Sequence, residues 1–190
     1  MPGHPKQKIS FESTSPAEAL CTECGLCCTD VFHIVAYLEA DDDIALLKKA
    51  GFSIIFDAVE KKYKFYFPCP AHNGVCSIYS DRPSVCRWHK CDLLRGLNDG
   101  TVKIEDALRA VHEIKALIEE ILPELKTCVE NNASNSPAVL MGEISKKLQN
   151  DQSKEKFKKD NAALLLKYGI FNFLKRKYFY KEDSSFIKLS

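Results

Sequence analysis

Apolar residues recur every three or four positions through the second half of the chain, which is the spacing of one face of an α-helix. Pro123 lies within the first of these runs. Because proline lacks the amide hydrogen that a helix requires, we expect that helix to kink or restart there. The positions that define it are Ile104, Leu108, Val111, Ile114, Ile118, Ile121 and Leu125.

Two further helices are predicted beyond a polar loop over residues 131–136. Ser136 followed by Pro137 gives the cap and the first residue of one helix. The next helix has apolar residues on one face, and Gly169 is expected to bend it. Those residues are Phe157, Leu164, Leu165, Tyr168, Phe171, Leu174 and Tyr178.

Shorter elements are predicted in the first half of the chain. Residues 31–38 and 62–67 are rich in β-branched or aromatic residues, which favours two short strands. Between them, the acidic residues 41–43 favour the N-terminus of a helix, and Gly51 favours its end.

The segment after the second strand is expected to consist mostly of turns. The turn signal Asn73-Gly74 predicts a hairpin-like loop with Cys69 and Cys76 on its two sides. A short helix is expected over residues 85–94.

The bulk composition is that of a globular chain. Of its 190 residues, 45% are hydrophobic and 28% are charged, so we expect one domain with a helical extension. No apolar run is long enough to span a membrane, so no transmembrane segment is expected. The first residues also lack the apolar core of a secretory signal, which favours a cytoplasmic location.

Charge is nearly balanced over the whole chain but not along it. The net charge is +1, which argues against a general nucleic-acid-binding surface. Residues 154–181 nevertheless hold nine Lys or Arg and two acidic residues. A solvated helix face accounts for this, and a basic amphipathic helix that docks on an acidic partner, a membrane surface or nucleic acid is the alternative. A protein partner bound through the helical half is therefore an open expectation, and no specific nucleic acid is indicated.

Cysteine is the feature that bulk composition does not explain. The chain has nine cysteines, and eight of them lie between positions 21 and 91. In a reducing compartment, clustered cysteines are more often metal ligands or redox groups than disulfides. Cys128 instead lies on a helical stripe and is expected in the core. The predicted metal ligands are Cys21, Cys24, Cys27, Cys28, Cys69, Cys76, Cys86 and Cys91.

These observations predict a mainly α protein with a small irregular or β cysteine-rich metal module and a helical C-terminal half. We expect a disordered tail over residues 1–16. The metal-binding module is expected over residues 17–97, and the helical region over residues 98–190.

The order and spacing of the cysteines resemble the CxxCxxCC family, whose YkgJ-type members are known as zinc- or iron-chelating domains. The resemblance covers about residues 18–95 and implies a metal or iron–sulfur centre held by these cysteines. Many relatives follow Cys-Arg with an aromatic residue and a proline, where this chain has Trp88-His89. The matching motifs are Cys21-x2-Cys-Gly-x-Cys-Cys, Cys69-Pro, and Gly74-Val-Cys76-Ser-Ile-Tyr-x2-Arg82-Pro83-x2-Cys86-Arg87 followed by Cys91.

Two kinds of metal centre fit the pattern. Eight thiolates would complete two closed four-cysteine zinc sites. The run Cys21-x2-Cys24-x2-Cys27 with a remote Cys69-Pro70 is instead typical of a cluster of four irons and four sulfides. We expect an iron–sulfur cluster, with zinc as the alternative.

Other residues near the cysteines in sequence are candidates for supporting roles. Arg82 and Arg87 are expected to offset the negative charge of the metal-bound thiolates without binding the metal themselves. The alternative for Arg82 is that it only holds the turn by bonding backbone carbonyls. His72 and His89 are weaker ligand candidates, because eight thiols are already available. His33 has no supporting neighbours in sequence and is expected to be an ordinary residue.

Four functions are compatible with these features, and the fourth, a cysteine nucleophile activated by a histidine, is the least economical use of so many thiols. The first is a redox or accessory iron–sulfur protein, and the second is a structural zinc module whose helical half binds a partner. The third is a methyl-transfer enzyme, since flagellin lysine methylases look similar in carrying such a cysteine cluster within a larger protein. The chain has no Gly-rich dinucleotide loop, Walker loop or His-Glu-x2-His motif, so the sequence assigns no catalytic residue and no substrate.

Overall fold

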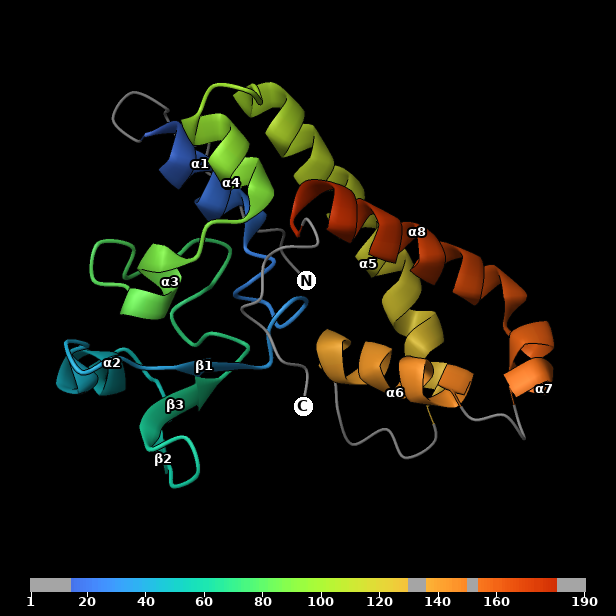
Figure 1. The fold of residues 1–190 in the computed structure, drawn as a ribbon, viewed down its shortest axis with the longest axis horizontal. Coiled ribbons are helices and arrows are strands. Elements are labelled where there is room, and N and C mark those ends of the chain that lie inside the picture. Colours follow the sequence, from blue (N-terminus) through green and yellow to red (C-terminus); the bar gives the residue numbers. More distant parts are fainter. Residues whose placement is uncertain (1–14, 130–135, 150–153, 181–190) are drawn as a thin grey trace, which may run out of the picture.

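The computed structural model describes residues 15–129, 136–149 and 154–180 (Figure 1). The cysteine-rich part contains α1 (Pro16–Cys24), β1 (Val35–Tyr37), α2 (Ile44–Lys49), β2 (Ile55–Asp57), β3 (Lys62–Tyr66), α3 (Ser84–Trp88) and α4 (Asp92–Asn98). The second half contains α5 (Ile104–Cys128), α6 (Pro137–Gln149), α7 (Lys154–Asp160) and α8 (Ala162–Tyr178). This confirms the predicted fold class, a mainly α protein with a small β region and a helical C-terminal half.

The sheet has three antiparallel strands in the order β1-β3-β2. β1 and β3 lie within the two predicted strand segments, and β2 was not predicted. Its residues Ile55 and Phe56 are both exposed, so β2 lacks the alternation of apolar and polar positions that marks a half-buried strand. The sheet and α2 enclose a small core of Ala36, Leu38, Leu47, Phe52, Phe65 and Ala71.

The predicted helix over 41–51 is confirmed in its type and its ends. The carboxylate of Asp43 accepts a hydrogen bond from the amide of Leu46 at 2.9 Å and so caps α2. Gly51, just beyond the helix, has a φ of +92°. Such a positive φ is the conformation in which glycine ends a helix.

α5 is one helix of 25 residues and continues through Pro123. The predicted restart at this proline is therefore wrong. Ile121 and Leu125, on either side of it, are fully buried against the other helices. This packing compensates for the one backbone hydrogen bond that proline removes.

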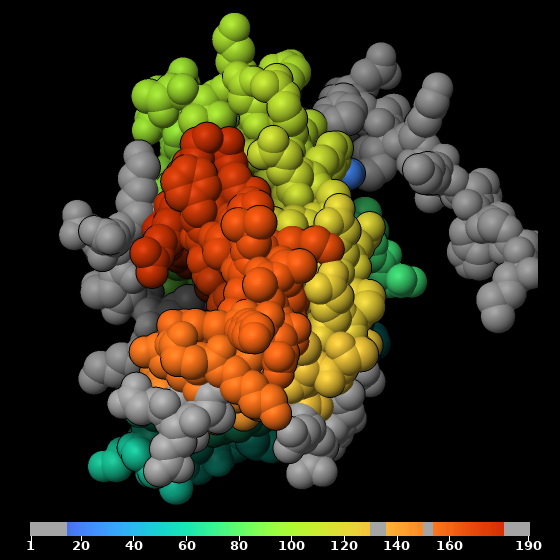
Figure 2. All heavy atoms as spheres, turned by 90° about the vertical axis from the view of Figure 1, so that its right-hand side faces the viewer, coloured from blue at the N-terminus to red at the C-terminus, as the bar shows by residue number. Residues whose placement is uncertain are grey.

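α6 begins at Pro137 as predicted, and the Ser136 hydroxyl accepts a hydrogen bond from the amide of Val139 at 3.1 Å. The rest of the expected polar loop, residues 131–135, lies outside the described residues. The last predicted helix is divided at Asn161 into α7 and α8, while α8 runs through Gly169 without interruption. Helix α8 (orange to red) lies over α5 (yellow) in Figure 2.

One hydrophobic core joins the cysteine-rich part to the helical half. The ring centroid of Phe32 lies 4.9 Å from that of Phe179 and 6.4 Å from that of Phe171. The boundary expected at residue 97 therefore does not separate two cores. At the other end, Ser15 and Pro16 form the start of α1, and residues 1–14 of the expected tail lie outside the described ranges. No helix within those ranges has the length and apolar character needed to cross a membrane.

Candidate metal centre

The first four cysteines come from the end of α1 and the turn that follows it. Cys21 and Cys24 are three residues apart and therefore lie on one face of the helix. The helix ends at Gly25, whose φ is +61°. The backbone then turns back, because the amide of Cys28 donates to the carbonyl of Gly25 at 2.9 Å. This turn presents Cys27 and Cys28 next to the helical pair.

Gly25 is required for this turn by its neighbours as well as by its backbone conformation. A Cβ atom at this position would lie 2.5 Å from Nε2 of His72. The imidazole of His72 therefore packs directly on the backbone of the cysteine turn. Its Nε2 is buried without a hydrogen-bond partner among the described residues.

The loop after β3 brings Cys69 to the same turn. The amide of Cys69 donates to the carbonyl of Cys28 at 2.8 Å. Cys76 is reached through the predicted hairpin-like loop, in which His72 and Cys76 form an antiparallel bridge and Gly74 has a φ of +79°. That part of the sequence prediction is confirmed.

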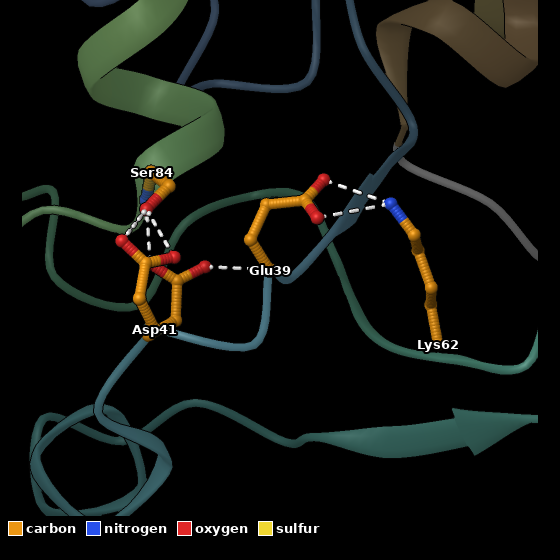
Figure 3. A network of polar contacts seen from close by, with 5 residues as sticks. Glu39, Asp41, Lys62 and Ser84 are labelled. Carbon is orange, nitrogen blue, oxygen red and sulfur yellow. Dashed lines mark hydrogen bonds and ion pairs between the residues drawn. The ribbon is translucent and has the colours of Figure 1, made fainter.

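Cys86 lies on α3, whose first turn is held by an acidic loop (Figure 3). The carboxylate of Asp42 accepts a hydrogen bond from the amide of Ser84 at 2.6 Å. The Ser84 hydroxyl donates to Asp41 at 3.2 Å, and Lys62 binds the neighbouring Glu39 at 2.8 Å. An acidic cap satisfies the free amides of a helix N-terminus and thus fixes the position of the cysteine on that helix.

The predicted short helix over 85–94 is divided in the structure. α3 ends at Trp88, and Cys91 is the residue that precedes α4. Of the last two cysteines of the motif, Cys86 therefore lies within α3 and Cys91 lies at the cap of α4.

The eight thiols form one electrostatically coupled group, in which we distinguish two overlapping sets of four. Cys76 acts on Cys21 and Cys86 acts on Cys27 across the two sets. In the first set, burial raises the pKa of Cys24 to about 12 and raises that of Cys27 as well, and the charge of Cys91 contributes to both. Cys21 acts on all three of these residues. The first set is therefore Cys21, Cys24, Cys27 and Cys91.

The second set is centred on Cys69. A hydrogen bond from the Cys28 thiol lowers the pKa of Cys69 to about 7, and the same bond raises the pKa of Cys28. Burial raises the pKa of Cys86 to about 12, and the charge of Cys69 acts on both Cys86 and Cys76. The second set is Cys28, Cys69, Cys76 and Cys86.

The spacing of the cysteines in the sequence favoured Cys69 as the fourth member of the set that contains Cys21, Cys24 and Cys27. The first three cysteines of the run are joined by Cys91, whereas Cys69 belongs with Cys28. Sequence spacing could not distinguish these two remote cysteines, because both return to the turn at 25–28 only through tertiary contacts. Adjacent Cys27 and Cys28 face different sets.

The donors fit a thiophilic metal. Buried thiols with raised pKa values stay protonated unless a cation offsets the thiolate charge, and a metal ion does so directly. Thiolate ligands suit zinc and iron–sulfur clusters. All eight predicted ligands are partly buried and unpaired by disulfides.

The two arginines behave differently from each other. Arg82 donates from Nε to the carbonyl of Tyr79 at 2.8 Å, and its guanidinium lies 3.4 Å from the centre of the Tyr79 ring. Burial raises the pKa of Cys21, and the Arg82 charge and hydrogen bonds from Tyr79 and Arg82 oppose that rise. Arg87 instead binds the Ser84 hydroxyl at 2.7 Å and lies near Asp42 at 3.9 Å. Arg82 therefore interacts with the thiol of Cys21, while Arg87 interacts with the acidic loop at Asp42.

Two histidines approach the first set. One ring nitrogen each of His33 and His89 and the Sγ of Cys27 all lie within 4.8 Å of one another. His33 was expected to be ordinary, because no motif residue stands beside it in sequence. For His89 the sequence did contain a signal, because this histidine occupies the position at which many members of the resembling family have proline.

The ninth cysteine is placed as expected. Cys128 lies at the C-terminal end of α5 and packs against the core, where its thiol donates to the side-chain oxygen of Asn161 at 2.8 Å. It takes no part in either set of four thiols.

Comparison with known proteins assigns the cysteine-rich part to a family. The model of the CxxCxxCC family, described as "Putative zinc- or iron-chelating domain", matches residues 20–115, which include all eight thiols of the two sets. Neither the curated proteins nor the solved structures gave a match. The match covers half of the chain, so this protein belongs to the CxxCxxCC family of zinc- or iron-chelating domains.

Proposed function

We propose that the protein holds an iron–sulfur cluster in at least one of its two four-thiol sets and serves as a redox or accessory protein. The observation that carries this proposal is the spacing of the thiols. Within the described part of the chain, the three donors that lie within 4.8 Å of one another are Cys27, His33 and His89. Among any three of the thiols, at least one pair therefore lies further apart than this, although Cys28 and Cys69 are within hydrogen-bond reach of each other.

Such spacing favours a cluster over a lone zinc ion. Sulfur atoms bound to one tetrahedral zinc at about 2.3 Å lie about 3.8 Å apart. A cluster places iron and sulfide between the cysteine sulfurs, so its four thiolates stand further from one another. When bound, the cluster supplies one-electron redox chemistry at a potential set by burial and by hydrogen bonds to sulfur.

The residues around the sets would tune that potential. Hydrogen bonds from Tyr79 and Arg82 reach Cys21, and all four cysteines of the first set are partly buried. Positive charge and hydrogen bonds near thiolates stabilise the more negative, reduced state of a cluster. The two sets meet at the adjacent residues Cys27 and Cys28, so a cluster in either set would lie close to the other set.

Metal analysis of matched cysteine variants tests the proposal. Cys24→Ser removes a ligand from the first set, Cys86→Ser removes one from the second, and Cys128→Ser removes a thiol from neither. Iron, acid-labile sulfide and zinc should be measured on anaerobically purified protein together with the visible spectrum. We expect Cys128→Ser to match the wild type and at least one of the other two to lose iron and sulfide together. Zinc without sulfide in the wild type would instead make the thiols a structural zinc module.

A further inference from the structure

The imidazoles beside Cys27 are not explained by two cysteine-only sets. The rings of His33 and His89 meet edge to face, with their centroids 5.0 Å apart. Nε2 of His89 is buried and has no hydrogen-bond partner among the residues that the structure describes. Buried polar atoms are nearly always satisfied in native proteins, and a bound ion is one explanation for an exception.

His33 is oriented in the manner of a metal ligand. Its Nε2 lies 3.1 Å from the hydroxyl of Tyr180, which leaves Nδ1 free to bind a metal. Ligating histidines usually bind the metal with one ring nitrogen and use the other for such a hydrogen bond.

The charges around the three donors allow a divalent cation. One thiolate and two neutral imidazoles leave such an ion with a single positive charge, and the ammonium of Lys175 lies near Cys27. An adjacent metal ion favours the thiolate form of Cys27, so this ligand forms its negative charge where the ion binds.

We propose that Cys27, His33 and His89 hold a single divalent transition-metal ion in a mixed site. This assignment takes Cys27 out of the first set and leaves the second set, Cys28, Cys69, Cys76 and Cys86, as the cysteine-only centre. One thiolate and two imidazoles are ligands that zinc accepts at tetrahedral distances. Three protein ligands leave a fourth position for water or a small ligand, as in zinc sites that perform chemistry. The inference goes beyond the proposed function, because the mixed site stands whether the other cysteines hold iron–sulfur or zinc.

The mixed site also gives a role to residues outside the family match. Tyr180, just beyond α8, orients His33 and lies far beyond residue 115, where the match ends. The backbone carbonyl of Phe179 accepts a hydrogen bond from the amide of Asp92 at 3.3 Å, which anchors this end of the chain beside α4. The helical half therefore completes a metal site that the family motif only begins.

Histidine variants of the whole protein test this site. His33→Ala and His89→Ala each remove one ligand. His112→Ala is the matched control, because His112 is exposed on α5 and contacts Glu23 at 3.2 Å. Zinc, iron and sulfide are counted after anaerobic purification, and Co²⁺ is added to metal-stripped protein as a spectroscopic probe. We expect each of the first two variants to lose about one metal ion per chain and the cobalt bands of a mixed sulfur–nitrogen site. The control should lose neither.

A conservative variant keeps the test decisive if a histidine variant fails to fold. Tyr180→Phe retains the ring and removes only the hydroxyl that meets His33. We expect it to keep the wild-type circular dichroism and to bind Co²⁺ roughly 10- to 100-fold more weakly at this site.

The outcomes separate this inference from the proposed function. Wild-type zinc content and wild-type cobalt absorption in folded His33→Ala and His89→Ala would overturn the mixed site. So would a cobalt spectrum typical of four thiolates. Loss of the histidine-dependent ion with no iron or sulfide in any sample would support the mixed site and overturn the cluster proposal alone.

Discussion

The hydroxyl of Tyr180 lies 3.1 Å from Nε2 of His33, although 147 residues separate them in the chain. The contact joins Tyr180, just beyond the end of α8, to the segment that follows the four-cysteine run. Phe32, next to His33, packs on both Phe171 and Phe179 from the same end of the chain. The metal-binding region and the helical half are therefore stabilised by a shared interface. A substitution that destabilises one of them should also destabilise the other.

Phe171→Ala should reveal this coupling. Phe171 is 1% exposed, and truncating a buried phenylalanine to alanine costs about 3–5 kcal/mol through lost burial and a residual cavity. We expect a lower free energy of unfolding in urea and a lower temperature at which metal is released, in one common transition. Phe173→Ala is the matched control, since Phe173 lies on the same helix but is 63% exposed. It should change the free energy of unfolding by no more than about 0.5 kcal/mol. The shared interface would be contradicted if the two variants lowered the free energy of unfolding equally. It would also be contradicted if Phe171→Ala left the temperature of metal release unchanged.

Gly25→Ala should be more harmful than Gly74→Ala. Both glycines have a positive φ, where a side chain costs about 1–2 kcal/mol. At Gly25 the new Cβ would also meet the imidazole of His72 at 2.5 Å, whereas at Gly74 no atom lies within 4 Å. We expect urea denaturation to give a loss of about 1–2 kcal/mol for Gly74→Ala and a larger loss for Gly25→Ala, because the ring of His72 must shift. Metal content should fall only in Gly25→Ala. If the two variants lose the same stability, the contact with His72 does not constrain the cysteine turn.

The sequence predicted the parts of this fold that depend on local spacing. The apolar face of α5 and the Ser136-Pro137 start of α6 follow from periodicity and capping alone. Clustering in the sequence also singles out eight cysteines as metal ligands, and that assignment stays a prediction. Local patterns could not show that Pro123 is tolerated, because burial on both sides of it comes from other helices.

The arrangement within the site depends on contacts between distant segments. Asp42 caps α3 from 42 residues away, an acceptor that no local pattern around Ser84 indicates. His33 is a candidate ligand only because the chain folds its ring against His89. The pairing of Cys69 with Cys28 likewise follows from a backbone hydrogen bond between their segments. Motif spacing identifies the donors, and tertiary structure decides which of them meet.

The ion pair on the β2–β3 hairpin should give the stability of the protein a measurable acid dependence. Nζ of Lys64 lies 2.6 Å from a carboxylate oxygen of Asp57, and the two side chains are 16% and 13% exposed. The hydrogen bond from Lys64 lowers the pKa of Asp57 from 3.8 to about 2, and backbone hydrogen bonds from Glu60 and Val59 act in the same direction. A carboxylate whose pKa is depressed by folding stabilises the native state at pH values above its unfolded pKa, and this stabilisation disappears as the pH falls toward the folded value.

Asp57→Asn therefore tests this linkage. Between pH 5 and pH 7 its urea midpoint should lie below that of the wild type by a constant amount, and the gap should close as the pH falls from about 4 to about 2. Acid-induced loss of metal affects both proteins and cancels in the comparison. Glu60→Gln, on the same turn, controls for the removal of one negative charge and should show no such gap. A gap between Asp57→Asn and the wild type that persists unchanged at pH 2 would mean that the carboxylate acts through its shape and not through its charge.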